Sequence, residues 1–423
     1  MQVKKILLLL LIVLLTITTA CGAEQTKPKP KPERTNEAGI INQDQSTEVI
    51  NSRTNFSFSL YPQLVKESAG ENTFVSPVSI MLALMMAYNG AVGDTQAAMA
   101  TALESSGLSL DEINRANQAW IQSMEKVDEG VQLQVANSLW GREGISFEET
   151  FINSVQDFYQ AEVQSLDFNK PEASETINRW VSDQTNDKIN QIVDKSINPD
   201  TILFLINAIY FNGKWEKPFE ENLTEDHTFY SENSMTKQHP FMTQGGKFQY
   251  YEDDKFQAVA LPYGAGETSM YVFLPDESSS LEEFHEQLTA ENWNQWLTGF
   301  QEQKGQVSLP KFKLKYDVEL KNVLSAMGMG IAFEEGAADY TGMVVDKASK
   351  PFISSVKHKT YIDVHEEGTE AAAVTSIEVG VTSVNVNEPE PFEMKMDRPF
   401  FIVINDNLTG SMLFMGSIYE PEL

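Results

Sequence analysis

The sequence predicts an α+β fold built as one large domain. Segments with the composition of helices come early in the chain, whereas segments typical of strands dominate its second half. The composition, 41% hydrophobic and 10% aromatic, provides for a large buried core and is too apolar for a disordered chain. No period of about 20–50 residues repeats, which disfavours a solenoid or a propeller.

The first residues have the pattern of a secretory signal. Lys4 and Lys5 precede an apolar run over residues 6–15 that is too short to span a membrane, and small or polar residues follow up to Ala20. We therefore interpret residues 1–20 as a signal peptide.

Cys21 is the only cysteine, so the mature fold contains no disulfide. Its position after the signal resembles the acylated cysteine of bacterial lipoproteins, although Thr18 stands where an aliphatic residue is usual. We expect a lipid anchor at Cys21; an ordinary secretory peptide with an incidental cysteine is the alternative. Residues 21–46 are polar, and the Lys-Pro repeat at 27–32 favours extended polyproline II structure. They are interpreted as a stalk, with the folded domain at 47–423.

Hydrophobic patterns place the elements of this domain in order. Helices are expected at 80–88, at 96–103 with Thr95 as N-cap, and near 148–158. Strands are expected at 132–139, 203–211, 258–262, 270–275, 306–316 and 355–364, followed by a terminal pair at 400–404 and 412–416.

Charge and motifs argue against several classes of function. With 31 lysines and arginines against 61 aspartates and glutamates, the net charge of −30 is repelled by phosphate backbones, so we expect no nucleic-acid partner. The sequence lacks a Walker loop, a G-x-S-x-G elbow and an H-E-x-x-H zinc motif, and the G-x-G at Gly328 and Gly330 has no third glycine. We expect no enzyme activity, no cofactor and no metal. A hydrolase with a dispersed triad remains an alternative.

Residues 366–376 are the most informative segment. Their alanines and glutamates also fit a surface helix, which is the plain interpretation. With a period of two, one face of the segment carries no charge, whereas the other carries glutamates. The charge-free face consists of Thr369, Ala371, Ala373, Thr375, Ile377 and Val379. This alternation suits a strand that enters a sheet with one face buried, and Gly368 offers a flexible pivot before it.

The same segment resembles the reactive-loop hinge of the serpin family. The hinge consists of Glu366, Glu367, Gly368, Thr369, Glu370, Ala371, Ala372, Ala373, Val374 and Thr375. Further stretches match the family in order along the chain, at 72–80, 207–215, 309–312, 338–343, 397–400 and 413–416. The resemblance implies a serpin fold of three mixed β-sheets and about nine helices with an exposed reactive-centre loop. It also implies inhibition of serine-type proteases as a suicide substrate, in which cleavage forms an acyl-enzyme and hinge residues 366–380 insert into the main sheet as a strand.

The resemblance also assigns roles to residues outside the hinge. A polar cluster would lie where the sheet opens, with His358 in a structural rather than a catalytic role. Its members are Ser76, Ser79, Asn207 and His358. Trp215 matches a residue below the point of first insertion.

Family spacing places the reactive bond between Thr382 and Ser383. The loop is longer than usual, so Val381, Val384 and Val386 remain alternatives. No basic residue occurs between Gly368 and Glu393, which disfavours trypsin-like targets. Elastase-like or subtilisin-like proteases with small apolar pockets fit better.

Other interpretations stay open beside inhibition. A non-inhibitory serpin acting as a binding protein or chaperone would carry bulky or charged residues on the entering face of the hinge, and none is seen there. We expect an extracytoplasmic monomer that meets the membrane through its lipid anchor.

Overall fold

The structure, a computed structural model, describes residues 43–124, 130–198, 200–232, 235–369 and 390–423. The predicted signal peptide, Cys21 and almost all of the predicted stalk lie outside the described residues. The described residues belong to one compact unit that starts at Ile41. The first helix begins at Gln43, inside the segment expected to be stalk.

Nine α-helices occur within the described ranges. They are α1 (Gln43–Glu67), α2 (Pro77–Tyr88), α3 (Gly93–Ala102), α4 (Leu110–Met124), α5 (Glu149–Tyr159), α6 (Pro171–Gln184), α7 (Leu281–His285), α8 (Ala290–Gly299) and α9 (Lys321–Leu324), with short helical turns η1 (Glu221–Leu223), η2 (Ser325–Met329) and η3 (Gly330–Phe333). The helices expected near 80–88, 96–103 and 148–158 correspond to α2, α3 and α5.

Helix α2 and helix α3 have different kinds of start, and only that of α3 differs from the expectation. Ser76 caps α2, because its hydroxyl accepts the N–H of Ser79 at 3.3 Å and Pro77 follows at the first helical position. Thr95 was expected to cap α3, which is wrong: α3 begins at Gly93. Thr95 is buried inside the first turn, where its hydroxyl accepts the N–H of Asp339 at 2.9 Å.

Among the described residues, six strands form a mixed sheet, called the main sheet below, in the order β10–β11–β12–β4–β2–β3. Its strands are β2 (Val131–Arg142), β3 (Glu162–Leu166), β4 (Leu203–Lys214), β10 (Phe312–Glu319), β11 (Ile353–His365) and β12 (Gly368–Thr369). Strands β4 and β11 are parallel neighbours along most of β4 and also pair directly with each other. The two-residue strand β12 lies between them at one end, antiparallel to both.

The second sheet has nine strands in the part of the chain that the structure describes. They are β1 (Thr73–Val75), β5 (Glu225–Tyr230), β6 (Thr236–Glu252), β7 (Phe256–Tyr263), β8 (Thr268–Pro275), β9 (Gln301–Pro310), β13 (Phe392–Lys395), β14 (Phe400–Asp406) and β15 (Met412–Ile418). The long strand β6 pairs in turn with β5, β9 and β7. The expected third sheet is therefore continuous with this one through β6, and the α+β class is confirmed.

The single strand expected at 306–316 is two strands in different sheets. β9 ends at Pro310 in the nine-stranded sheet, and β10 begins at Phe312 in the main sheet. Lys311 is the one residue between them, so the chain crosses from one sheet to the other at this position.

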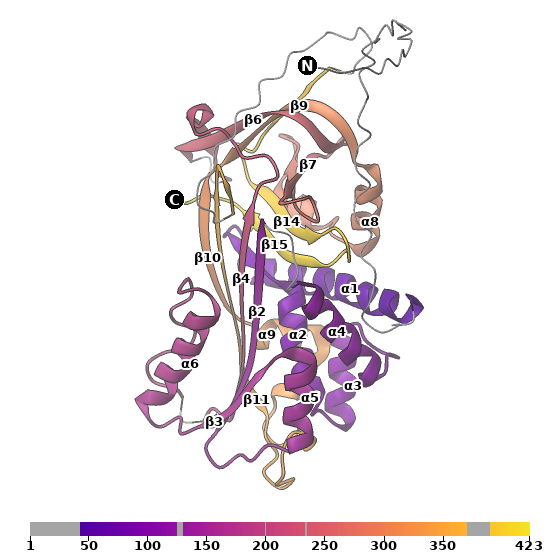
Figure 1. The fold of residues 1–423 in the computed structure, drawn as a ribbon, viewed down its shortest axis with the longest axis vertical. Coiled ribbons are helices and arrows are strands. Elements are labelled where there is room, and N and C mark those ends of the chain that lie inside the picture. Colours follow the sequence, from indigo (N-terminus) through magenta and orange to yellow (C-terminus); the bar gives the residue numbers. More distant parts are fainter. Residues whose placement is uncertain (1–42, 125–129, 199, 233–234, 370–389) are drawn as a thin grey trace, which may run out of the picture. The chain divides into compact units, whose positions relative to one another are not determined.

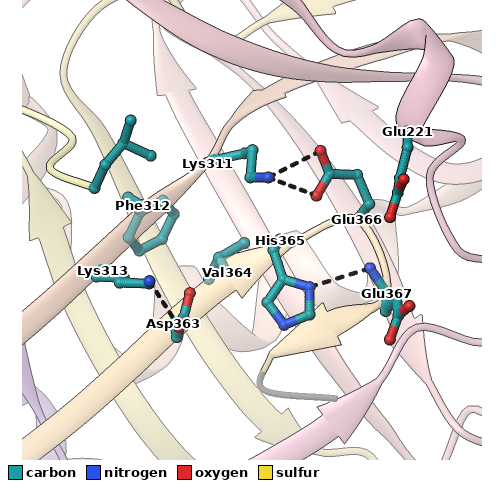
Figure 2. Close-up of a pocket in the computed structure, with 10 residues that line it drawn as sticks. Glu221, Lys311, Phe312, Lys313, Asp363, Val364, His365, Glu366 and Glu367 are labelled. Atoms are coloured by element: carbon teal, nitrogen blue, oxygen red, sulfur yellow. Dashed lines mark hydrogen bonds and ion pairs between the residues drawn. The ribbon is translucent and has the colours of Figure 1, made fainter. Parts of the chain in front are cut away.

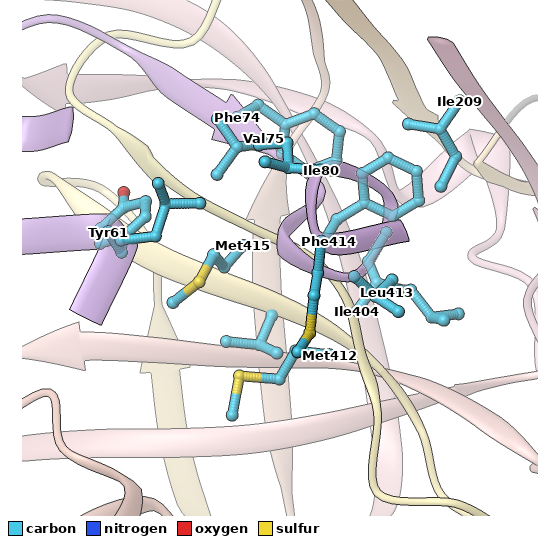
Figure 3. Packing of buried hydrophobic residues seen from close by; sticks show 14 of the residues in the cluster. Tyr61, Phe74, Val75, Ile80, Ile209, Ile404, Met412, Leu413, Phe414 and Met415 are labelled. Carbon is cyan, nitrogen blue, oxygen red and sulfur yellow. The ribbon is translucent and has the colours of Figure 1, made fainter. Parts of the chain in front are cut away.

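The apolar core lies between the two sheets and around α2. Every residue of α2 is buried, and Figure 3 shows Ile80 from this helix among side chains of β1, β4 and β15. The rings of Phe74 and Phe414 stack there with centroids 4.9 Å apart. A separate apolar cluster covers β2 and β4 below α6, which Figure 1 shows on the side of the main sheet opposite α2 and α5.

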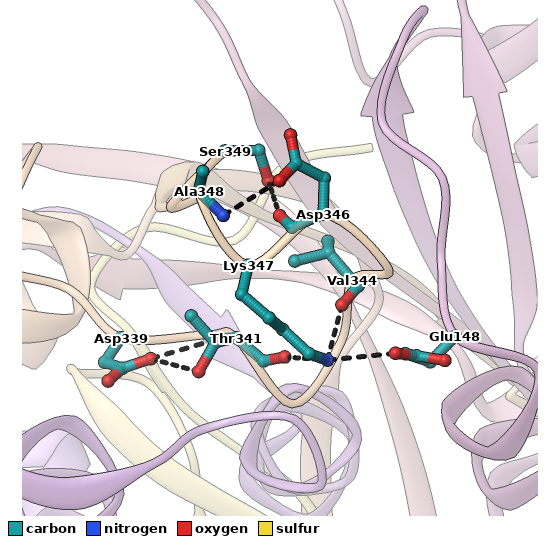
Figure 4. A network of polar contacts seen from close by, with 8 residues as sticks. All are labelled: Glu148, Asp339, Thr341, Val344, Asp346, Lys347, Ala348 and Ser349. Carbon is teal, nitrogen blue, oxygen red and sulfur yellow. Dashed lines mark hydrogen bonds and ion pairs between the residues drawn. The ribbon is translucent and has the colours of Figure 1, made fainter.

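A loop over residues 339–349 is held by one lysine. The Lys347 ammonium donates to the carbonyls of Thr341 and Val344, both at 2.6 Å, and pairs with Glu148 at 3.0 Å (Figure 4). This loop includes residues 339–343 of the matching stretch 338–343, and these contacts fasten it to the start of α5.

Candidate functional site

The predicted hinge starts inside the main sheet. Gly368 and Thr369 form β12, which pairs with Lys214 and Gly213 on β4 and with the end of β11. Both residues are buried. The expectation that the uncleaved loop is solvent-exposed is therefore wrong for them, because their backbone finds partners on strands at both sides. Hinge residues 370–375 and the predicted bond at Thr382 and Ser383 lie outside the described residues.

Gly368 fits this position because it lacks a side chain. Its φ of +155° is unfavourable for other residues. An added Cβ would lie 2.1 Å from the carbonyl oxygen of Gly213 and 2.7 Å from the Cα of Lys214. The pivot inferred from the sequence is thus also the residue that lets β12 approach β4.

The Thr369 side chain meets an aromatic stack below the sheet. Its Oγ1 lies 2.7 Å from the hydroxyl of Tyr263, and the Tyr263 ring stacks on Trp215 with centroids 4.4 Å apart. Burial raises the pKa of Tyr263, so the phenol stays neutral. Trp215 also donates its Nε1–H to the carbonyl of His365 at 2.9 Å and its backbone N–H to that of Glu367 at 3.0 Å. The predicted first-insertion residue Trp215 therefore contacts the hinge directly.

A charged latch, the ion pair of Lys311 and Glu366, fixes the chain two residues before the pivot Gly368. Figure 2 shows the Lys311 ammonium beside the carboxylate of Glu366, at 3.0 and 2.8 Å from its two oxygens. Thr224 donates to the same carboxylate at 2.8 Å, and the Phe219 N–H donates to the Glu366 carbonyl at 2.8 Å. Burial alone would raise the pKa of the Glu366 carboxyl, but the bonds from Lys311 and Thr224 hold it below 4.5. A cavity of about 440 Å³ lies beside this latch.

The structure brings the predicted polar cluster together at the junction of β4 and β11. His358 accepts the N–H of Ser76 on Nε2 at 3.1 Å, so its proton is on Nδ1, which donates to Asn207 at 2.6 Å. The amide nitrogen of Asn207 donates to Asn137 at 2.9 Å and to the carbonyl and hydroxyl of Ser79. Burial lowers the pKa of His358 to about 3, so the ring is neutral. Because His358 and Asn207 are paired on β11 and β4, their bond must break when these strands part.

Sequence reasoning missed several residues of this site. Tyr263, Thr224 and Asn137 belong to no motif that was recognised, and Lys311 was noted only as part of a matching stretch. Tyr263 and Thr369 are 106 positions apart, so no local pattern connects them.

A further grouping of polar side chains among the described residues consists of His285, Ser417 and Tyr61. His285 lies 2.8 Å from the hydroxyl of Ser417, which is also 2.6 Å from the hydroxyl of Tyr61, but Ser417 is fully buried and cannot meet a substrate. Within the described ranges, no three His, Cys, Asp or Glu side chains are arranged to hold a metal ion. No helix in that part of the chain is long and apolar enough to cross a membrane.

Comparisons with known proteins agree with this geometry. The family model described as Serpin (serine protease inhibitor) matches residues 51–421. An uncharacterized serpin-like protein of Methanosarcina acetivorans is 35% identical over 91% of this chain and 91% of its own length. Human Serpin B8 is 36% identical over 86% of this chain and 97% of its own length.

Solved structures give the same result. The native state of the thermophilic serpin tengpin has a TM-score of 0.82 and 30% identity, covering 90% of this chain and 95% of tengpin. Human thyroxine-binding globulin in complex with thyroxine has a TM-score of 0.81 and 28% identity, covering 90% of this chain and all of that one.

Proposed function

The chain belongs to the serpin family, whose members are in general inhibitors of serine proteases, and we propose that it inhibits serine-type endopeptidases as a suicide substrate. The observation that carries the proposal is β12. Two hinge residues already lie between β4 and β11, with Thr369 buried on the side that the period-two pattern assigns to the sheet interior.

The proposed reaction begins with cleavage of the loop near Thr382. The protease serine attacks the carbonyl carbon of Thr382, the bond to Ser383 breaks, and the new amino group leaves on Ser383 while an ester joins Thr382 to the protease. Hinge residues 366–380 then lengthen β12 along β4 and β11. The protease is carried along before water can hydrolyse the ester.

The geometry supports such a movement in two ways. Strands β4 and β11 are parallel, so a strand between them can run antiparallel to both, as β12 does. One of the pairs that must separate, His358 and Asn207, belongs to the polar cluster, whose hydrogen bonds can be exchanged for others when the strands part.

The small and β-branched residues around the proposed bond favour proteases with small apolar pockets. Elastase-like and subtilisin-like enzymes are the proposed targets, and trypsin-like enzymes are disfavoured because no basic residue lies between Gly368 and Glu393. We also propose that the protein acts as an extracytoplasmic monomer, held to a membrane by a lipid on Cys21.

A binding role without inhibition is the second candidate. It is favoured by one observation, the likeness to thyroxine-binding globulin, whose structure is a complex with a small ligand. The charge-free entering face of the hinge favours inhibition instead.

Incubation with a panel of elastase-like, subtilisin-like and trypsin-like proteases tests the proposal. We expect a 1:1 complex that survives SDS with at least one of the first two classes. Mass spectrometry of the released C-terminal peptide should then give a first residue within 381–387. If every active protease cleaves the loop and leaves unmodified, the chain is a substrate and not an inhibitor.

A further inference from the structure

Arg53 is a buried cation in the contact of α1 with α4. Only 5% of the residue is exposed, and it forms no ion pair with the described residues. One terminal nitrogen of its guanidinium donates to the carbonyl of Ala116 at 3.3 Å and to the amide oxygen of Asn117 at 2.7 Å. Both acceptors are neutral, whereas buried arginines are rare unless an anion is paired with them. These contacts therefore leave the positive charge uncompensated.

Two buried N–H donors at this contact have no acceptor in the described part of the chain. They are Nε of Arg53 and Nε1 of Trp120, a residue that is 3% exposed. The guanidinium carbon of Arg53 lies 5.3 Å from the centroid of the Trp120 ring, so both donors belong to one place between α1 and α4. Buried donors in folded proteins are nearly always satisfied by protein, ordered water or an ion.

Asp406 is the acidic group that attracts Arg53 at longer range. It is buried at the end of β14, where its carboxylate accepts the Leu408 N–H at 3.1 Å and the hydroxyl of Thr409. Burial lowers the pKa of Arg53 to about 10, because desolvation outweighs the attraction of Tyr159 and Asp406. The guanidinium is thus charged at neutral pH and still lacks an anion in contact with it.

We propose that Arg53 and Trp120 bind one small monovalent anion, such as chloride, between α1 and α4. The ion lies about 3 Å from each of the two free N–H groups and neutralises the guanidinium. Because both donors are inside the helix packing, the ion has to be comparable in size to a water molecule, which excludes phosphate and organic acids. A water molecule would accept the same bonds and leave the charge uncompensated, so the anion is favoured.

The anion completes a polar network that joins four helices. Asn117 accepts from Arg53 and donates to the hydroxyl of Tyr159 at 3.4 Å, and this hydroxyl donates to Asn114 at 2.5 Å. Asn114 exchanges two amide hydrogen bonds with Asn89, which follows α2 directly. The network therefore runs from α1 through α4 and α5 to the end of α2. We expect the bound ion to stabilise the packing of α1 against these helices, whether or not the proposed protease inhibition holds.

Urea unfolding of the full chain in sodium chloride and in sodium gluconate, at one ionic strength, tests the site. The unfolding midpoint should rise with chloride in a saturable way, with a Kd on the order of 10 mM for one or two charge-assisted hydrogen bonds. Trp120→Phe keeps an aromatic ring but removes the Nε1–H, so the Kd should weaken by about threefold or more. Trp180→Phe on α6 is the matched control and should leave the Kd unchanged.

Arg53→Met and Arg115→Met form a second matched pair. Arg115 is exposed and has a carboxylate partner, Asp111 at 2.8 Å, so its loss should not alter the response to chloride. Arg53→Met should abolish the saturable response, and general effects of the salt are the same in both variants. An equal response in the parent and Arg53→Met would overturn the proposal.

Bromide provides a direct measurement that does not depend on the folding of any variant. Anomalous scattering from crystals of the parent protein grown in sodium bromide should show one ion between Arg53 and Trp120. A water molecule alone at this position, or no ordered density between the two side chains, would refute the anion site.

Discussion

Lys311 and Glu366 form an ion pair at the point where the main sheet passes into the hinge. Their Nζ and Oε2 atoms are 2.8 Å apart, with 30% of the lysine side chain and 9% of the glutamate side chain exposed. Lys311 is the single residue between β9 and β10, and Glu366 follows β11 directly. The pair therefore fastens the start of the hinge to the junction of the two sheets.

Glu366→Gln should destabilise the protein, because Lys311 loses its charged partner in a partly buried site. We expect a decrease of about 1–3 kcal/mol in the free energy of unfolding, measured with urea at pH 7. The control is Glu302→Gln, which breaks the exposed pair of Lys247 and Glu302 and should cost less than about 0.5 kcal/mol. The pKa of Glu366 is lowered in the folded state. Its carboxylate should therefore contribute to the free energy of unfolding above pH 4.5, and this contribution should disappear as the pH falls through the pKa of the folded state. Equal losses of unfolding free energy in both variants would show that the Lys311–Glu366 pair stabilises the fold no more than the exposed pair does.

Gly368→Ala should expel β12 from the gap, since the new methyl group would meet the carbonyl of Gly213 at 2.1 Å. Hydrogen exchange provides the measurement. The amides of Trp215 and Phe219, which donate to Glu367 and Glu366, should exchange faster in the variant. Gly245→Ala is the matched control, because a Cβ there meets nothing within 4 Å. Unchanged protection of both amides in Gly368→Ala would refute the fit argued for the glycine.

Thr369→Arg should convert the inhibitor into a substrate. The Thr369 side chain is buried beside Tyr263, and an unpaired guanidinium there costs several kcal/mol. The substitution should expel β12 from the gap in the uncleaved protein, so that the inserting hinge has to bury the guanidinium after cleavage. Insertion should therefore slow, and hydrolysis of the acyl-enzyme should win. The number of inhibitor molecules consumed per protease inactivated should rise severalfold. Glu370→Arg is the control, because the period-two pattern places residue 370 on the opposite, solvated face; a similar rise for both would contradict that assignment.

The pH dependence of stability should carry a contribution from His358. Burial keeps its ring neutral in the folded state, with a pKa of about 3 instead of 6.5. The unfolded chain binds the proton first on acidification, so stability is lost as the pH falls from about 6.5 towards 3. In His358→Gln the slope of unfolding free energy against pH should be shallower by about 1 kcal/mol per pH unit in this window. His285, whose pKa burial lowers to about 4, should give a similar effect over a narrower window. Parallel curves for His358→Gln and the parent would mean that the histidine titrates normally.

Cys21→Ser should release the protein from membranes without changing protease inhibition. The prediction follows from the lone cysteine after the predicted signal peptide and from the polar segment, predicted to be a stalk, between this cysteine and the domain. Membrane fractionation with an inhibition assay on both fractions is the measurement. Equal membrane association of variant and parent would exclude the lipid anchor.

The sequence alone determined the elements whose signals are local. The helix at 80–88 and the buried strand at 203–211 have continuous apolar runs, and both occur as α2 and β4. Amphipathic α6 was missed because it is polar overall. Its buried positions Ala173, Ile177 and Val181 have helical spacing, which is a signal that could have revealed it. The alternation and the small residues of the hinge are properties of the segment itself, but they also fit a surface helix, and the resemblance to the serpin family was needed to assign the segment its role.

Only the tertiary structure decided where these elements meet. Lys311 could not be identified as a crossing point, because apolar residues continue on both sides of it while the two strands pair in different sheets. The partners of the hinge are equally distant, with 55 positions between Lys311 and Glu366 and 106 between Tyr263 and Thr369. Such contacts become favourable only after both sheets exclude water and bring the groups together, so their energy is a property of the folded arrangement and not of any segment.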